Sequence, residues 1–324
     1  MMRVKDFELP SKLYMLRKTF ELDSHIRNQK SIENLTRHLL SSVRLEHQPD
    51  YNARLEKFWA REHAYYIILC ERVGKKYSEY LPGREYSYVL LRDIILRIAR
   101  KKQPSVLDGG CGSGVACALL AQKGGTATGV DITRSALRLA KAISGEHKTY
   151  VNLALGNLTE LPFQNRMFDV VFSLGVFEHF PPQTQEEVFK EFARVSKHRI
   201  LLVVPNKSSP IYKTMAESEF KLVPPALVYP EEHRQFPVDF SHFSGHSGIS
   251  MSESSAFHIV PPKVIPRKYL TKESCRFFRK VVQQALSIWD GKPITTWSSV
   301  ENGCSCEEKA RYGWFSYAIY EKSR

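Results

Sequence analysis

Short apolar runs alternate with helical patterns between residues 105 and 205, and this alternation limits the fold more than any other feature of the chain. The apolar runs, rich in Val, Ile and Leu, lie at 105–107, 127–130, 150–154, 169–173 and 200–204. Expected helices separate several of them, at about 114–122, 135–143 and 183–195. Buried strands joined by crossover helices form a parallel sheet covered on both faces. We therefore predict an α/β fold with a doubly wound sheet.

The segments that flank this core differ from it in residue pattern and composition. Within residues 85–104 an apolar stripe at helical spacing is expected to pack against the sheet; it consists of Leu90, Leu91, Ile94, Ile95 and Ile98. Residues 206–265 are rich in Pro, Ser, Gly and His, which is typical of an irregular insertion. A helix is expected to open at Thr271, with Thr271 or Ser274 as its cap. Strands near 293–297 and at 312–320 are expected to form a hairpin.

These patterns divide the chain into four parts. We expect a helical N-terminal extension over 1–84 that covers the substrate, and a ligand-binding sheet core over 85–205. Residues 206–265 are expected to form a lid inserted after the fifth strand. The C-terminal helix and hairpin, 266–324, would then complete the core.

The positive charge of the chain lies mainly outside the sheet core. The 324 residues include 47 Lys and Arg against 34 Asp and Glu, a formal net charge of +13. Residues 1–104 hold 21 basic and 13 acidic residues, whereas 105–205 hold 10 and 9. The excess of positive charge therefore indicates either partner binding or a solvated surface, and says little about the chemistry of the core. Six scattered cysteines, no long apolar run and a charged start lead us to expect a cytoplasmic protein without a membrane span.

A glycine-rich turn, VLDGGCGSG (106–114), follows the first strand of the core. Its glycines let the backbone turn sharply and approach a ligand that a Cβ would exclude. The turn departs from the dinucleotide-binding pattern G-x-G-x-x-G, because position 117 is cysteine. Asp108 ends this strand and suits an ammonium group, and Asp131 ends the next strand and suits the two hydroxyls of a ribose. S-adenosylmethionine carries both groups.

Five segments resemble, in their order and spacing, the class I S-adenosylmethionine-dependent methyltransferases, in particular the small-molecule branch called type 11. They are VLDGGCGSG (106–114), GVDIT (129–133), GNLTELPF (156–163), FDVVFSLGVFEHF (168–180) and ILLVVPN (200–206). The resemblance implies a Rossmann-like sheet, parallel except for an antiparallel C-terminal hairpin. It also implies S-adenosyl-L-methionine as cofactor and S-adenosyl-L-homocysteine as product. It covers the central third of the chain well and does not cover the first 80 or so residues or 206–265.

The resemblance assigns the methionine end of the cofactor to one group of residues. Asp108 and the backbone around Gly110 and Gly112 would hold this end, and Leu174 and Gly175 would lie near it. The remaining turn residues, Cys111 and Gly114, are included in the expected site, with Cys111 as a small packing side chain.

A second group would hold the nucleoside end. Asp131 would bind the ribose, and Ile132 would lie against the adenine. Asn157 stands where family members often have Asp, and its amide oxygen can still accept from the adenine amino group. The backbone N–H of Leu158 would meet the adenine ring.

Methyl transfer from a sulfonium is an in-line displacement, so the protein mainly aligns the nucleophile and removes its proton where necessary. The candidate base is His179, which follows the fourth strand at the carboxyl edge of the sheet. Glu178 is a candidate to orient it or to bind a cationic substrate. In the alternative interpretation, this pair is a polar helix start that shapes the pocket.

Other polar residues give weaker signals. His242 and His246, or Cys304 and Cys306, lack further ligands, so we predict no metal site. Four tyrosines are candidates for the substrate pocket or for core packing: Tyr65, Tyr66, Tyr86 and Tyr88.

The leading hypothesis is a biosynthetic methyltransferase acting on an O, N or C nucleophile of a small or medium-sized metabolite. The motifs expected of DNA methyltransferases are absent: residues 173–176 read SLGV, and no Pro-Cys pair occurs in the chain. Two alternatives remain open. One is an RNA or protein methyltransferase recruited by the basic first third, and the other is a non-catalytic protein that binds S-adenosylmethionine.

Overall fold

The structure, a computed structural model, describes residues 2–3, 59–60, 63, 67, 76, 85–214, 237–245, 248–261, 264–289 and 291–322. Most of the predicted N-terminal extension and part of the predicted lid therefore lie outside the described residues. The largest sheet has seven strands in the order β4-β3-β2-β5-β6-β9-β7. These are β2 (Ser105–Gly109), β3 (Thr126–Asp131), β4 (Asn152–Leu155), β5 (Phe168–Leu174), β6 (Ser196–Pro205), β7 (Ile249–Phe257) and β9 (Phe315–Lys322).

Strands β2 to β6 pair in parallel, and β9 pairs antiparallel with both β6 and β7. The prediction of a Rossmann-like α/β sheet with a parallel core and an antiparallel C-terminal part is thereby confirmed. Because all five parallel strands point the same way, their carboxyl ends meet at one edge of the sheet. This edge is where open α/β folds bind ligands.

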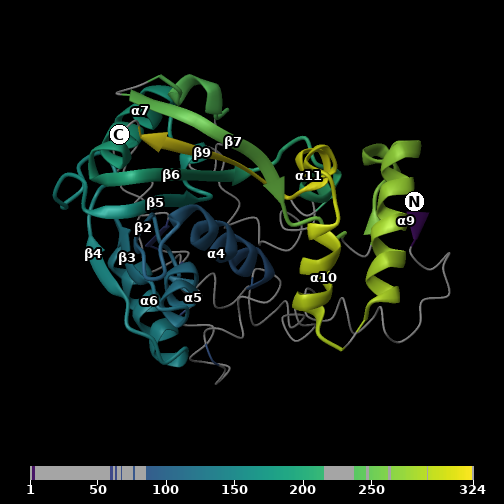
Figure 1. Cartoon of the computed structure of the whole chain (residues 1–324), viewed down its shortest axis with the longest axis horizontal. Helices are drawn as coiled ribbons and strands as arrows, with labels where there is room; N and C mark the ends of the chain where they lie inside the picture. The colour runs from purple at the N-terminus through teal and green to yellow at the C-terminus, as the bar shows by residue number, and fades with distance from the viewer. Residues whose placement is uncertain are drawn as a thin grey trace, which may run out of the picture.

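Alternating residues of the strands supply the two faces of the sheet. Val106 and Val170 pack with helix α4 (Glu85–Ala99) on one face. Their chain neighbours Leu107 and Val171 pack with helix α7 (Pro182–Val195) on the other. In α4 the predicted stripe is confirmed, because Leu91, Ile95 and Ile98 are buried in that contact. Figure 1 shows α4, α5 (Val115–Gln122) and α6 (Arg134–Glu146) on the face opposite α7.

The predicted C-terminal hairpin is wrong. Residues Pro293–Asn302 form helix α10, with a proline in its first turn, and Cys306–Tyr312 form helix α11. The partner of β9 at the sheet edge is β7, from the segment that was predicted to be irregular. Strand β7, ISMSESSAF, pairs on one side only and leaves most of its polar side chains accessible. An edge strand of this kind lacks the β-branched alternation by which strands are found in a sequence.

The C-terminal helices form a second apolar cluster. Helix α9 (Lys272–Ser287) opens at Thr271, as predicted, and Thr271 and Ser274 cap each other reciprocally in a capping box. Its buried face packs against Trp297 of α10 and Tyr312 of α11. Figure 1 shows α10 and α11 beyond the carboxyl end of β6, so this cluster lies off the same edge as the ends of the parallel strands.

Short elements complete the described fold. Strand β1 (Met2–Arg3) pairs antiparallel with β8 (Val264–Ile265). Three 3-10 turns are η4 (Phe177–His179), η6 (Phe240–Phe243) and η8 (Arg267–Tyr269). Over the residues that the structure describes, no helix is both long and apolar enough to span a membrane.

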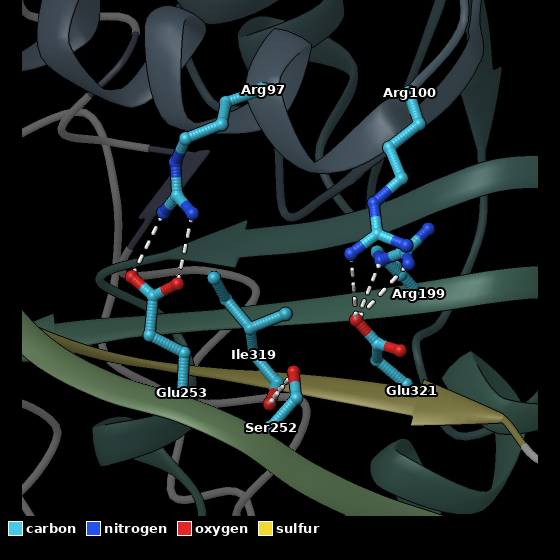
Figure 2. A network of polar contacts seen from close by, with 7 residues as sticks. All are labelled: Arg97, Arg100, Arg199, Ser252, Glu253, Ile319 and Glu321. Atoms are coloured by element: carbon cyan, nitrogen blue, oxygen red, sulfur yellow. Dashed lines mark hydrogen bonds and ion pairs between the residues drawn. The ribbon is translucent and has the colours of Figure 1, made fainter.

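Ion pairs connect the C-terminal end of α4 to the antiparallel strands β7 and β9, as Figure 2 shows. The Arg97 guanidinium donates two hydrogen bonds to the Glu253 carboxylate of β7, at 2.9 and 2.8 Å. Arg199 of β6 donates to Glu321 of β9 at 3.0 Å, and Arg100 approaches the same carboxylate at 4.0 Å. These contacts connect the parallel core with the strands that close the sheet.

Candidate functional site

The glycine turn after β2 is bent by backbone conformations that favour glycine. Gly110, Gly112 and Gly114 have φ values of +78°, +50° and +70°. A Cβ on Gly110 would lie 2.7 Å from the side chain of Val176, which follows β5. The turn therefore passes close to the segment after β5, and a bare backbone lines the carboxyl edge here.

Asp131, at the end of β3, binds this turn directly. Its Oδ2 accepts a hydrogen bond from the Gly112 N–H at 3.0 Å. Its Oδ1 accepts from the Thr133 N–H at 2.9 Å and from the Thr133 hydroxyl at 3.1 Å. The carboxylate is 7% exposed, so it lies at the wall of the site with its position fixed by three donors.

Asp108, near the end of β2, lies in a drier environment. It is 4% exposed, and the Cys117 thiol is 3.6 Å from its Oδ2. Burial raises the pKa of Asp108 to about 8, the Cys117 thiol opposes this, and the charge of Asp131 adds to it. The carboxyl group is therefore mostly neutral at pH 7, and a cation beside it would favour the ionised form.

Cys111 and Gly114 lie within the turn but pack inward. A Cβ on Gly129 of β3 would lie 2.7 Å from the Cys111 sulfur, and one on Gly114 would lie 2.5 Å from Ala140 of α6. Burial raises the pKa of the Cys111 thiol well above its ordinary value, so the group is a neutral thiol.

The segment after β4 approaches Asp131 from the other side. The Gly156 N–H donates to the Asp131 carbonyl oxygen at 3.1 Å. Asn157 is exposed, and its Oδ1 accepts from the Thr159 N–H at 3.1 Å, whereas Leu158 is buried. Ile132 is partly exposed next to Asp131. The structure thus brings the predicted nucleoside-end residues to adjacent strand ends.

Glu178 and His179 lie in the 3-10 turn η4, directly beyond β5. Leu174 ends that strand, and Gly175 turns the chain with a φ of +71°. Both side chains of the pair are nearly buried, with 3.9 Å between His179 Nε2 and Glu178 Oε1. Burial raises the pKa of Glu178 to about 8, against the opposing charge of Lys207. The pair lies at the edge where Val176 meets the glycine turn.

Two residues of the N-terminal part that are not among the predicted site residues reach the site. Trp59 contacts the His179 ring edge to face, with 5.2 Å between ring centroids. His63 Nε2 lies 3.3 Å from the position that a Cβ on Gly112 would take. Their spacing of four residues in a helical stretch is the one signal that the sequence offers. It does not show which surface the helix meets.

The remaining polar candidates lie away from these strand ends or outside the described residues. Tyr86 is fully buried and donates to Glu301 at 2.8 Å, and Tyr88 packs at the α4 interface. His242 bonds Glu186 at 2.8 Å. Cys304 and Cys306 flank the start of α11 instead of lying in a hairpin loop. Three candidates fall outside the described part of the chain: Tyr65, Tyr66 and His246.

No metal centre is built from the residues that the structure describes, since no three His, Cys, Asp or Glu side chains gather to form one. The site instead fits an organic ligand with two polar ends. The glycine turn lies between a buried carboxyl at Asp108 and a carboxylate at Asp131 that three donors hold in place.

Known proteins share this part of the chain. Residues 106–199 match the family described as "Methyltransferase domain". The chain is 28% identical over 186 residues to ubiquinone biosynthesis O-methyltransferase from Nitrosomonas europaea, covering 54% of this chain and 76% of that protein. It is 26% identical over 151 residues to ajmaline N-methyltransferase from Rauvolfia serpentina, covering 44% of this chain and 50% of that protein.

Among solved structures, magnesium protoporphyrin IX methyltransferase from Synechocystis PCC 6803 with bound SAH is similar with a TM-score of 0.46. The two are 14% identical, and the match covers 94% of this chain and 100% of that one. The family match, the sheet and the glycine turn identify the core of this chain as a class I S-adenosylmethionine-dependent methyltransferase domain.

Proposed function

We propose that this enzyme transfers the methyl group to an O, N or C nucleophile of a small or medium-sized metabolite. The observation that supports cofactor binding most strongly is the pair of carboxyl groups, Asp108 and Asp131, on either side of the glycine turn. The names of the two relatives specify an oxygen acceptor in one case and a nitrogen acceptor in the other. We infer that the segments flanking the shared core select the acceptor.

In this proposal the methionine end of the cofactor lies against Asp108 and the backbone of Gly110 and Gly112. Leu174 and Gly175 border this end, and Cys111 and Gly114 shape the turn from below. The buried carboxyl of Asp108 ionises to meet the ammonium group, and the bare glycine backbone allows close approach.

At the nucleoside end, the proposed partner of the ribose hydroxyls is Asp131. Ile132 would lie against the adenine, and the backbone N–H of Leu158 would meet the adenine ring. The Asn157 amide oxygen, although it already accepts from Thr159, retains a second lone pair for the adenine amino group.

When bound, the cofactor supplies a methyl group already activated by its sulfonium. The residues of this chain would align the acceptor and remove its proton. We propose His179 as the proton acceptor. An ionised Glu178, 3.9 Å from the His179 ring, would stabilise the imidazolium, and a neutral Glu178 would leave the ring less basic.

We also infer that residues 1–84 form a substrate cover, because Trp59 and His63 reach the site. The part of 206–265 outside strand β7 is proposed to complete this cover. We also propose that the protein is cytoplasmic. It is supported by the described cysteines, which are all free thiols, as is usual in a reducing compartment.

Calorimetry with S-adenosylmethionine tests this function. The wild type is expected to bind, and Asp131→Asn is expected to weaken binding by about 2 kcal/mol, roughly 30-fold, through loss of a charged acceptor. Asp169→Asn is the matched control, because Asp169 is a buried carboxylate at the start of β5, on the opposite edge of the sheet. No binding by the wild type, or equal losses in both variants, would refute the proposal.

A further inference from the structure

One helical turn of the N-terminal part connects the two halves of the site. Trp59 and His63 lie four residues apart and therefore share a helix face, with 6.2 Å between their ring centroids. His63 Nε2 faces Gly112 of the turn after β2, at 3.3 Å from its would-be Cβ. Trp59 meets the His179 ring beyond β5 at 5.2 Å and an interplanar angle of 77°. The turn thus touches the proposed cofactor side and the proposed acceptor side at once.

This helical turn is anchored on the layer of helices beside the sheet. The Ser135 hydroxyl, in the first turn of α6, donates to the Ala60 carbonyl oxygen at 3.1 Å. Ile67 is 5% exposed and packs among Val115 of α5 and Leu139 of α6. Both helices start next to the site, α5 after the glycine turn and α6 shortly after Asp131. The anchor therefore fixes the turn relative to the groups that would hold the cofactor.

We propose that His63 is a cofactor-contacting residue and that Trp59 is a positioning residue for His179. The proposal rests on the methyltransferase function given above. The chemistry of His63 suits a ligand with a sulfonium and an ammonium, because a neutral ring offers one donor and one acceptor without adding positive charge. Burial lowers the pKa of His63, while Asp131 opposes the shift, so the ring is neutral near pH 7.

The two contacts belong to one helix. A cofactor that touches His63 beside the glycine turn would act on the same helix that holds Trp59 against the His179 ring. Cofactor binding is therefore expected to change the surroundings of the Trp59 indole.

The cofactor contact is tested by titrating S-adenosylhomocysteine calorimetrically into the full chain. His63→Ala is expected to weaken binding about tenfold, and His63→Gln, which keeps a neutral donor and acceptor, is expected to recover part of that loss. His198→Ala is the matched control, because His198 is an exposed histidine near the start of β6, away from the carboxyl edge. It is expected to bind as the wild type does.

The coupling is tested by tryptophan fluorescence at saturating S-adenosylhomocysteine. Binding is expected to change the tryptophan emission of the wild type. This change is expected to vanish in Trp59→Phe and to persist in Trp289→Phe. In His63→Ala it is expected to shrink even when the ligand is saturating, a result that a merely structural role would not produce.

The outcomes separate the two levels of the proposal. If the wild type does not bind S-adenosylhomocysteine, the proposed function fails and this inference fails with it. If the wild type binds but His63→Ala has the same affinity, or Trp59→Phe keeps the full emission change, only the inference is overturned.

Discussion

Asp108 carries a cost in the free protein that a bound cofactor would remove. Its carboxyl group is buried with one weak thiol donor, and its pKa is raised to about 8. A neutral carboxyl can be buried more easily than a charged one, so the free protein keeps its proton at pH 7. An ammonium group placed beside it favours the ionised form and lowers that pKa.

Cofactor binding at pH 7 is therefore expected to release roughly one proton, because the Asp108 pKa falls from above the solution pH to below it. Calorimetry in two buffers of different ionisation enthalpy measures this release as a difference in apparent binding enthalpy. Asp108→Asn should bind more weakly and show no such difference. An equal buffer dependence in the variant would assign the proton to another group.

The residues of the site were predictable from the sequence to unequal degrees. Asp108 and Asp131 end neighbouring strands, so strand order alone places them together. Trp59 and His63 were not predictable in the same way, because a helix face says nothing about the surface on which it packs. The high pKa of Glu178 was also hidden, since it depends on burial by residues distant in the chain.

At the scale of elements, a buried carboxylate links three segments that the sequence does not associate. Glu301 of α10 is 3% exposed and accepts from the Tyr86 hydroxyl of α4 at 2.8 Å. It also accepts from the backbone N–H groups of His258 and Ile259, at 2.8 and 3.3 Å, just beyond β7. Ser87 of α4 bonds the His258 ring, whose pKa burial lowers to about 3. This network connects α4 and α10 to the end of the edge strand.

Glu301→Ala is expected to lower the free energy of unfolding by about 3 kcal/mol, because it leaves several buried donors without an acceptor. Urea denaturation measures the change. Glu273→Ala serves as the comparison: its ion pair with Arg311 is solvent-exposed and is expected to contribute at most about 1 kcal/mol, reduced by added salt. Equal losses in the two variants would contradict the distinction between buried and exposed carboxylates.

Secondary structure was predictable where burial leaves a recognisable pattern of apolar residues in the sequence. The strands β2, β3, β5 and β6 are buried on both faces and appear in the sequence as short apolar runs. Where helix α10 forms, the β-branched residues Ile294, Thr295 and Thr296 favour a strand prediction. Its proline in the first turn and its packing on α9 favour the helix instead.

At the scale of the whole molecule, the net charge of +13 is unevenly distributed between the segment that would bind the cofactor and the segment that could recruit a partner. The segment that contains the glycine turn is nearly neutral, with 10 basic and 9 acidic residues over 105–205. The basic excess lies mostly in the first third, where the structure describes few residues. Recruitment of a polyanion through that excess would therefore depend on salt, whereas cofactor binding would not.

We expect S-adenosylhomocysteine affinity to stay constant between about 0.05 and 0.3 M NaCl, because the carboxyl groups that would hold it are buried. Fluorescence anisotropy with a labelled RNA should show no complex at the higher salt concentration. A tight complex there, whose affinity falls with a log–log slope steeper than about −4, would favour the RNA methyltransferase alternative instead.

The place of β9 in the sheet has a consequence for how the chain acquires its structure. This strand lies between β6 and β7, yet helices α9, α10 and α11 separate it from β7 in the chain. During synthesis, β7 leaves the ribosome with no partner in the sheet, and β6 presents an unpaired apolar edge until β9 arrives. The sheet is therefore completed late, when β9 inserts between the unpaired edges of β6 and β7. Folding would pause in an aggregation-prone intermediate at that stage, and a chaperone that shields exposed strand edges would shorten the exposure.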